Sequence, residues 1–467
     1  MPNRRPATTF RPMSARFPDS GTLTRNAAVT ESRAQAANIC YDLRNGQLLG
    51  MSFDARTQAL EQRDRRWTRE LVYGMLRHRG WLDAMLDDRV HGGLAQIDAD
   101  LTDLLRLGAY QLLFMGSVPA YAAIAQTVEL AKRRHGIGAS KLTNAILRRI
   151  DRERETLKVA TPSDPASALA QEFSHPEWIV ARWIARFGPV ETRELLRANN
   201  DEAPLIARPF QVVREQLEAR FESAGVETAD APLVSDSVAL IGGVNAITEL
   251  GAFRQGLFFM QDPAATLVTR YACVATGSTI VDLCAAPGGK TFELSRTAGL
   301  VIACDVSALR MRNLTDNIVR LETGNVMRVV ADAAKPPVAH VDAVLVDAPC
   351  TGTGTFRRHP DARWRLRTSD LAVMSALQRR ILSSAADIVR PGGLLIYSTC
   401  SLEPEENEQQ AERFLAGHPD FSLEAPPAGV VPENVLDGGF LRVLPQRHGT
   451  DGAFAARFRR SRNKELV

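Results

Sequence analysis

Two cysteines stand in surroundings that are typical of reactive thiols. Cys350 lies in the segment DAPCTGTG, and Cys400 lies in the segment STCSLEPEENE. Each follows a short apolar run, so each is expected where a strand opens into a loop. A thiolate at such a place can be exposed and activated by nearby positive charge, which makes it a nucleophile. Three other cysteines are instead expected to be small buried apolar side chains: Cys40, Cys273 and Cys304.

A glycine-containing turn could hold a nucleotide. A predicted strand at 280–283 leads into seven residues that precede a predicted helix: Cys284, Ala285, Ala286, Pro287, Gly288, Gly289 and Lys290. Glycines at a strand-to-helix turn let a ligand approach the backbone, and the helix start offers unpaired N–H groups. The glycine spacing matches neither a phosphate-gripping loop nor a dinucleotide fingerprint. By itself the turn therefore indicates only a nucleotide site.

Acidic residues end successive predicted strands near this turn. Asp305 lies 23 residues beyond Asp282, after the second strand, where a carboxylate can bind the two hydroxyls of a ribose. Asp332 ends the third strand, and Asp347 ends the fourth. Each Asp alone could be a loop cap. Four acids at one rim of a sheet favour a ligand site.

These side chains need a sheet whose strands all end at one edge. Beyond about residue 260, short β-rich runs alternate with helical stretches. Strands are predicted at 279–283, 300–304, 326–330, 343–346 and 394–397, and helices at 291–297, 308–321, 370–389 and 404–416. The alternation predicts a mostly parallel, doubly wound α/β sheet that binds ligands at the carboxyl ends of its strands.

The remainder of the chain predicts a multidomain protein. Helical periodicity before residue 150 predicts an all-α domain, and a mixture of helical and strand patterns follows a loose segment near 155–170. We expect a disordered basic tail at 1–20, a helical domain at 21–160, a small α+β module at 170–250 and an α/β domain at 251–467. The tail has no apolar stretch, so a signal peptide is not expected, and an organellar transit peptide is the alternative.

Composition excludes several classes of protein. The 467 residues suffice for about two to four domains, and no run approaches the roughly 18 apolar residues of a membrane span. Six cysteines without paired spacing exclude a disulfide framework and a zinc-finger array, so we expect a cytoplasmic protein without a metal site. Of the 57 basic residues 51 are Arg, whose guanidinium suits phosphates and base edges, and this is a mild indication of nucleic-acid binding.

Three separated motifs resemble those of the RNA 5-methylcytosine methyltransferases that use S-adenosylmethionine. They are DLCAAPGGKT (282–291), DAPCTGTGTFRRHPDARW (347–364) and STCSLEPEENE (398–408). Helical segments resemble the RNA-binding fold of the antitermination factor NusB: RELVYGMLR (69–77), LLRLGAYQLLFMGSVPAYAAIAQTVELAK (104–132) and TNAILRRI (143–150). The combination resembles bacterial methyltransferases of small-subunit (16S) ribosomal RNA. The resemblance covers nearly all of the chain after residue 20 and implies a NusB-like helical domain before a Rossmann-like methyltransferase domain.

The resemblance implies a covalent mechanism. Carbon 5 of cytosine is a poor nucleophile, so a thiolate must first attack carbon 6. Cys400 would be that nucleophile, and Cys350 would assist product release. DNA cytosine methyltransferases attack with the Pro-Cys thiol instead, so exchanged roles are the alternative. Asp347 would hydrogen-bond the base. The base that removes the carbon 5 proton is not identified.

The resemblance also implies binding roles. S-adenosylmethionine would lie on Cys284–Lys290, with Asp305 at its ribose, Asp332 near its adenine and Asp347 near its methionine end. Lys290 could interact with the acidic rim or with the cofactor carboxylate. RNA phosphates and an unstacked base would be bound by a basic and aromatic segment, for which a solvated loop is the alternative: Arg357, Arg358, His359, Arg363 and Trp364.

Small departures leave this chemistry intact. Thr351 replaces a more common Ser, and Ala453 stands at a position that is often aromatic. Gln261 and Asp262 match a family motif that we interpret as structural. We expect a monomer that methylates small-subunit ribosomal RNA before the ribosome is fully assembled. The alternatives are a transfer RNA cytosine-C5 methyltransferase and a non-catalytic RNA-binding assembly factor.

Overall fold

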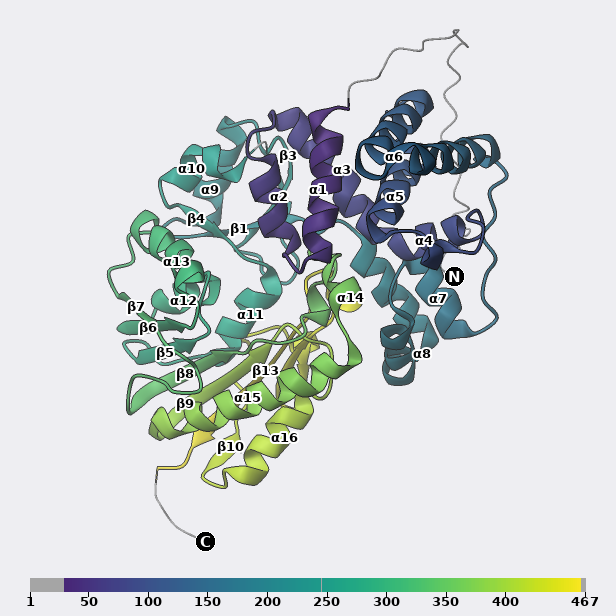
Figure 1. The fold of residues 1–467 in the computed structure, drawn as a ribbon. Coiled ribbons are helices and arrows are strands. Elements are labelled where there is room, and N and C mark those ends of the chain that lie inside the picture. The colour runs from purple at the N-terminus through teal and green to yellow at the C-terminus, as the bar shows by residue number, and fades with distance from the viewer. Residues whose placement is uncertain (1–28, 245, 463–467) are drawn as a thin grey trace, which may run out of the picture. The chain divides into compact units, whose positions relative to one another are not determined.

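The computed structural model describes residues 29–244 and 246–462, so the basic tail expected at 1–20 lies outside the described residues. The chain divides into two compact units between Arg193 and Glu194 (Figure 1). This division falls inside helix α8 (Glu177–Asn200), which is interrupted by a non-helical Gly188. The predicted domain boundaries stay predictions.

The first unit is helical, as predicted. Its helices are α1 (Glu31–Arg44), α2 (Leu49–Thr57), α3 (Gln62–Arg77), α4 (Arg79–Asp87), α5 (Ala99–Phe114), α6 (Ala120–Glu153) and α7 (Pro165–Phe173). Helix α5 is the centre of the unit, because its residues from Leu101 to Leu112 are buried and it contacts α1, α3, α4 and α6. Glycines allow this close packing: a Cβ at Gly74 would overlap Tyr110, and one at Gly108 would overlap Leu147.

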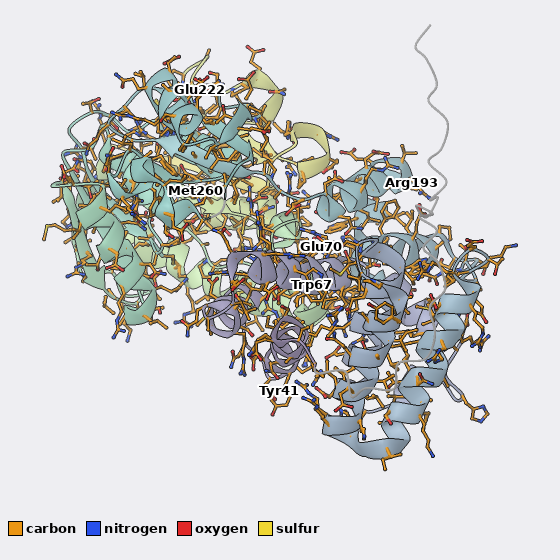
Figure 2. All side chains as sticks on the ribbon, turned by 90° about the horizontal axis from the view of Figure 1, so that it is seen from above. Tyr41, Trp67, Glu70, Arg193, Glu222 and Met260 are labelled. Atoms are coloured by element: carbon orange, nitrogen blue, oxygen red, sulfur yellow. The ribbon has the colours of Figure 1, made fainter. Side chains whose placement is uncertain are left out.

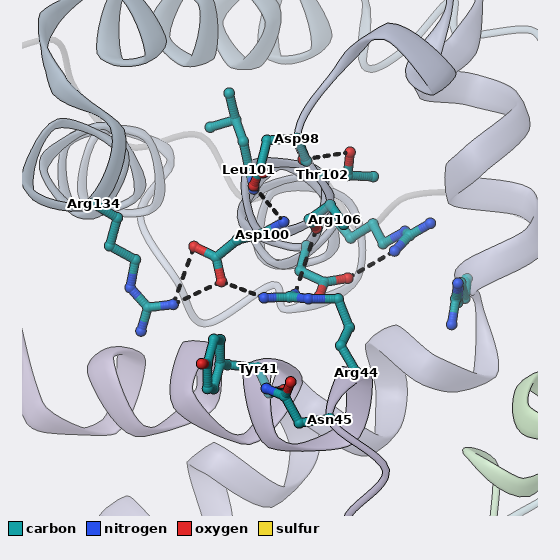
Figure 3. Close-up of polar contacts among 12 residues, drawn as sticks. Tyr41, Arg44, Asn45, Asp98, Asp100, Leu101, Thr102, Arg106 and Arg134 are labelled. Atoms are coloured by element: carbon teal, nitrogen blue, oxygen red, sulfur yellow. Dashed lines mark hydrogen bonds and ion pairs between the residues drawn. The ribbon is translucent and has the colours of Figure 1, made fainter.

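Polar contacts fix the helices around α5. Asp100 accepts hydrogen bonds from Arg44 of α1 and from Arg134 of α6, at 2.5 and 3.0 Å (Figure 3). On α3, Glu70 accepts a hydrogen bond of 2.7 Å from the Tyr110 hydroxyl, and the Arg33 guanidinium carbon lies 4.7 Å from the centroid of the Trp67 ring (Figure 2 labels Glu70 and Trp67). The arginine-rich composition thus serves partly to join helices.

The second unit begins with a small antiparallel sheet. Its strands are β1 (Leu205–Pro209), β2 (Glu227–Asp230), β3 (Val238–Gly242) and β4 (Phe258–Met260), in the order β2-β3-β1-β4. Helices α9 (Arg214–Ser223) and α10 (Gly251–Arg254) pack on it through a core that includes Phe221 and Phe258. The predicted α+β character of this region is confirmed.

A large sheet forms the rest of the second unit. Its parallel part has the order β9-β8-β5-β6-β7, with β5 (Thr279–Leu283), β6 (Leu300–Asp305), β7 (Val326–Val330), β8 (Val341–Asp347) and β9 (Val389–Thr399). The connecting helices are α12 (Gly289–Ser295), α13 (Ala308–Arg320), α14 (Ala362–Arg365) and α15 (Thr368–Ile388), preceded by α11 (Pro263–Ala272) and followed by α16 (Glu408–Gly417). The predicted parallel α/β sheet is therefore confirmed for these strands.

An antiparallel extension makes the sheet mixed. Strand β13 (Ala453–Arg460) pairs with β9 and β12 (Phe440–Val443), and β10 (Phe421–Leu423) and β11 (Leu436–Asp437) complete it. These strands were not predicted from the sequence, and the first six residues of β13 are all buried. In the described part of the chain, no helix is long and apolar enough to cross a membrane.

Candidate active site

The two predicted thiols lie together. Cys350 follows β8 and Cys400 follows β9, and these parallel neighbours pair Asp347 with Ser398. The two sulfur atoms are 3.3 Å apart. The hydrogen bond with Cys400, together with burial, raises the pKa of Cys350 well above its ordinary value. The Cys350 thiol is therefore harder to deprotonate than an ordinary thiol.

A lysine and a serine hold the carboxylate beside the thiols. Lys290 Nζ lies 2.8 Å from Asp347 Oδ2, and the Ser398 hydroxyl donates to Asp347 Oδ1 at 2.9 Å. Burial opposes the charge on Lys290, but the Asp347 carboxylate outweighs burial and raises the pKa of Lys290; Cys400 adds in the same direction. Of the two predicted roles for Lys290, the structure supports an interaction with the acidic rim.

A buried carboxyl lies beneath the glycine turn. Asp282 of β5 accepts a hydrogen bond of 2.6 Å from the hydroxyl of Thr291 on α12, so it joins the strand to the helix across the turn. Burial raises the pKa of Asp282 to about 7, against the effect of this hydrogen bond and with help from the negative charge of Asp347. Asp282 thus acts inside the fold, beneath the rim.

The turn itself is held by backbone contacts. Ala285 donates its N–H to the Cys304 carbonyl at 2.8 Å, and Ala286 donates to Asp305 Oδ2 at 3.3 Å. Gly288 has φ +112°, and a Cβ there would lie 2.4 Å from Leu314 Cδ1. The conformation and the close packing both require glycine.

The remaining predicted acids differ in accessibility. Asp332 is exposed after β7 and accepts the Ala334 N–H at 2.9 Å. Asp305 ends β6 as predicted, but its side chain has no exposed surface. Its Oδ1 accepts from the Ser307 N–H at 2.8 Å and from the guanidinium of Arg310 at 2.9 Å, and the Arg310 side chain is 56% exposed. Arg310 therefore covers the carboxylate from the solvent side.

The arginines predicted to bind RNA make contacts within the protein. Arg363 is completely buried and donates to Asn200 Oδ1 at 2.7 Å. Arg358 bridges Asp262 and Asp451 at 2.6 and 2.7 Å. These geometries explain how the loop after Cys350 is held, and they give no support to an RNA contact by these two side chains.

The other members of that segment differ in exposure. Arg357 is buried and donates to the Gly449 carbonyl at 2.8 Å. His359 is exposed and Trp364 is partly exposed. An RNA role for the segment stays a prediction, and it depends on His359 and Trp364. The interpretation of Asp262 as structural agrees with its bond to Arg358 and with its cap on the Ala264 N–H at the start of α11.

Three polar residues near the thiols were not predicted as site residues. They are Ser398, Glu406 and Asn407, which are all buried. The signal was present in the motif around Cys400, because polar residues cluster there directly before a helix. Their burial, which shows that they work inside the fold, could be known only from the three-dimensional structure.

The comparisons with known proteins agree with this architecture. The sequence model described as "16S rRNA methyltransferase RsmB/F" matches residues 273–459, that of the NusB family matches 30–152, and that of the RsmF/B-like ferredoxin-like domain matches 175–246. The fold and the matched domains thus define an RNA methyltransferase with an S-adenosylmethionine-dependent, Rossmann-like catalytic domain.

Relatives along the whole chain specify the family. "Ribosomal RNA small subunit methyltransferase B" of Vibrio cholerae is 33% identical, over 89% of this chain and 98% of the relative. The protein of the same name from Klebsiella pneumoniae is 32% identical, over 90% and 96%. The crystal structure of PH0851 is similar with a TM-score of 0.77 and 28% identity, over 92% of this chain and 98% of that one. The chain belongs to the ribosomal RNA small subunit methyltransferase B family.

Proposed function

We propose that this protein methylates carbon 5 of a cytosine in small-subunit (16S) ribosomal RNA through a covalent cysteine adduct. The observation that carries the proposal is the pair of thiols, 3.3 Å apart, beside the Lys290–Asp347 ion pair. A protein that only bound RNA would have no use for two thiols at one rim. The family membership supports ribosomal RNA as the substrate class.

Cys400 is the proposed nucleophile. Its thiolate attacks carbon 6 of the cytosine, and the new carbon–sulfur bond turns the ring into an enamine that is nucleophilic at carbon 5. The hydrogen bond with Cys400 and burial raise the pKa of Cys350 well above its ordinary value. A raised pKa disfavours Cys350 as the attacking thiolate, and the resemblance of the motif around Cys400 assigns the attack to Cys400, so we prefer this assignment to the exchanged one.

Asp347 is the proposed partner of the base. Both of its carboxylate oxygens are already oriented, one by Lys290 and one by Ser398. A carboxylate fixed in this way can accept a hydrogen bond from the exocyclic amine of cytosine and hold the ring against Cys400.

Cys350 is the proposed group for product release. After methyl transfer, a base removes the proton from carbon 5, and the bond between carbon 6 and Cys400 then breaks to restore the aromatic ring. The Cys350 thiol, 3.3 Å from Cys400, can assist this elimination.

The rim fits the proposed cofactor. When bound, S-adenosylmethionine supplies an electrophilic methyl group on a sulfonium. Asp332 is exposed after β7, and the Asp347 side chain, paired with Lys290 of the turn Cys284–Lys290, is 32% exposed. Asp305 suits the ribose hydroxyls once Arg310 moves away from its Oδ1, and the exposed position of Arg310 permits this.

A basic face on the helical unit is the proposed RNA contact of that unit. Gly136, with φ +85°, interrupts α6, and Lys141, Arg148 and Arg152 are exposed on the part that follows. Their spacing places them on one side of the helix. In the described part of the chain, the ion pairs of this half of α6 involve Arg149, Asp151 and Glu153 but none of these three residues. Such a face suits the phosphates of RNA.

Three further points belong to the proposal. We expect the protein to act as a monomer, in the cytoplasm and on RNA that is not yet part of a complete ribosomal subunit. The RNA target must let the cytosine leave its stack, so a single-stranded or loop site is favoured.

The direct test measures the product. Labelled S-adenosylmethionine is incubated with the protein and with either unmodified small-subunit ribosomal RNA or transfer RNA, and the labelled nucleoside is identified after digestion. The proposal expects 5-methylcytidine in the ribosomal RNA. Label in transfer RNA alone would support the alternative substrate, and no label in either RNA would support a non-catalytic assembly factor.

A further inference from the structure

We infer that Glu406 and Asn407, which are neighbours just before α16, are positioning residues that each hold one of the two thiol loops. Glu406 holds the loop of Cys350, and Asn407 holds the loop of Cys400. The inference rests on the proposed function, because it assigns these residues to two successive steps of that reaction.

Glu406 accepts hydrogen bonds from groups that flank and support the Cys350 loop. Its carboxylate has no exposed surface. Oε1 accepts the Thr351 backbone N–H at 2.9 Å and the Gln378 side-chain amide at 2.9 Å, and Oε2 accepts the Thr351 hydroxyl. Gln378 also donates to the Pro349 carbonyl at 2.9 Å. The residues on both sides of Cys350 are thereby tied to one buried carboxylate.

Asn407 does the same for Cys400. It is buried, and its Oδ1 accepts the Thr399 hydroxyl at 2.5 Å while its Nδ2 donates to the Ser401 carbonyl at 2.8 Å. These are the residues immediately before and after Cys400. The amide group of Asn407 therefore spans the nucleophile.

Adjacency in the chain links the two loops. Because Glu406 and Asn407 share a peptide bond, the loops that they hold cannot separate independently. The hydroxyl of Tyr397 on β9 donates to the Glu406 carbonyl at 2.6 Å, which fixes this point to the sheet. The Gly354 N–H donates to the Cys400 carbonyl at 2.9 Å and joins the loops directly.

The chemistry gives a reason for this arrangement. Cys400 and Cys350 act in turn on one cytosine ring, so both sulfur atoms must stay within reach of the same carbon–sulfur bond. A buried carboxylate is costly and is tolerated where several donors satisfy it, as they do at Glu406. A shift of about 1 Å in either loop is enough to lower a rate by about 100-fold.

The first experiment uses the full chain and separates the two steps. Methyl transfer and covalent protein–RNA adducts are measured for Glu406→Ala and Asn407→Ala, with Cys350→Ala and Cys400→Ala as references. Glu406→Ala is expected to accumulate adduct and to turn over at least about 10-fold more slowly, like Cys350→Ala. Asn407→Ala is expected to form at least about 10-fold less adduct, like Cys400→Ala.

Controls separate positioning from folding. Glu412→Ala removes an exposed acid from the same helix and is expected to behave like the wild type. If Glu406→Ala does not fold, Glu406→Gln keeps the shape and one acceptor, and adduct is expected to accumulate to a smaller extent. If folded Glu406→Ala lost adduct to the same extent as Asn407→Ala, the inference would be overturned, because a general structural role would not separate the two steps.

A second measurement does not depend on RNA. A small disulfide oxidant can take two electrons and two protons from Cys350 and Cys400 and leave a bond between their sulfur atoms. The rate of this bond's formation reports how the loops are held. Both Ala variants are expected to slow it at least about fivefold, since orientation governs such rates. Unchanged rates would overturn the inference even if the wild type forms no RNA adduct.

Discussion

The proton on Cys350 depends chiefly on its neighbour, because the hydrogen bond with Cys400 is the largest cause of its raised pKa. Cys400→Ala removes this bond. The Cys350 thiolate should then form at lower pH, and alkylation of Cys350 by iodoacetamide at pH 8 should become at least about 10-fold faster. Peptide mass spectrometry measures the rate of Cys350 alkylation in Cys400→Ala and in the wild type, in which Cys400 is intact. An equal rate in both proteins would mean that burial alone sets the protonation of Cys350.

Asp282 should make stability depend on pH. Its pKa in the folded protein is raised to about 7, so its contribution is fully present below its ordinary pKa near 4 and is lost as the pH rises to about 7. Asp282→Asn removes the titration and can still accept from Thr291. The variant should therefore gain roughly 2–4 kcal/mol relative to the wild type between pH 4 and pH 8.

The measurement for Asp282 is the urea midpoint of both proteins at several pH values. Subtracting one from the other cancels the titration of groups that the substitution leaves unchanged. A difference that stays constant with pH would contradict a raised pKa at Asp282.

Replacing Asp305 should weaken cofactor binding, whereas replacing Arg310 should not. Asp305→Ala removes the proposed ribose contact and should weaken S-adenosylmethionine binding by about tenfold, or about 1.4 kcal/mol. Arg310→Ala uncovers the same carboxylate and should leave binding unchanged or tighter. Calorimetry on the full chain gives both affinities. Weaker binding by Arg310→Ala would instead make Arg310 a cofactor contact.

Among the secondary-structure elements, the second half of α6 is predicted to contribute to RNA binding. Replacing Lys141, Arg148 and Arg152 with Glu should weaken RNA binding at least about 10-fold at low salt and should reduce its salt dependence, because fewer phosphate contacts are made. S-adenosylmethionine binding should not change. Arg379→Glu with Arg380→Glu, on the exposed face of α15, is the control for charge reversal elsewhere.

The strands of the alternating α/β region, β5 to β9, were predicted from the sequence. The strands after that region, β10 to β13, were not. Strands β5 to β8 were located within three residues at each end. Strand β13 was not predicted because Arg457 interrupts its apolar residues in the sequence. In the structure Arg457 is buried and donates to the Ala272 carbonyl at 2.9 Å. Tertiary contacts of this kind override local pattern.

The site was predictable to the extent that motifs fix residue types. The motifs placed Cys350, Cys400 and Asp347 at one rim, because the α/β alternation predicts parallel strands whose carboxyl ends lie at the same edge of the sheet. They could not show that Arg363 is buried or that Glu406 holds a loop, since the residue type alone does not determine whether a polar side chain is surrounded by water or by protein. Contacts across the fold decide that question.

In the whole molecule, the helical unit and the catalytic unit divide the work of the proposed reaction. The resemblance of the chain to one family along nearly its whole length made both parts predictable. The proposed chemistry depends only on residues of the catalytic unit, whereas the proposed basic face of α6 belongs to the helical unit. Variants of α6 should therefore change RNA affinity without changing the order of the covalent steps.

The most direct measurement follows the covalent intermediate. Wild type, Cys400→Ala and Cys350→Ala are each incubated with small-subunit ribosomal RNA and labelled S-adenosylmethionine, and the products are separated on denaturing gels. The proposed mechanism predicts that Cys400→Ala neither methylates nor forms an adduct, and that Cys350→Ala accumulates an adduct that is not released. If Cys350→Ala forms no adduct while Cys400→Ala accumulates one, the roles of the thiols are exchanged, and full activity of both variants would contradict covalent catalysis by this pair.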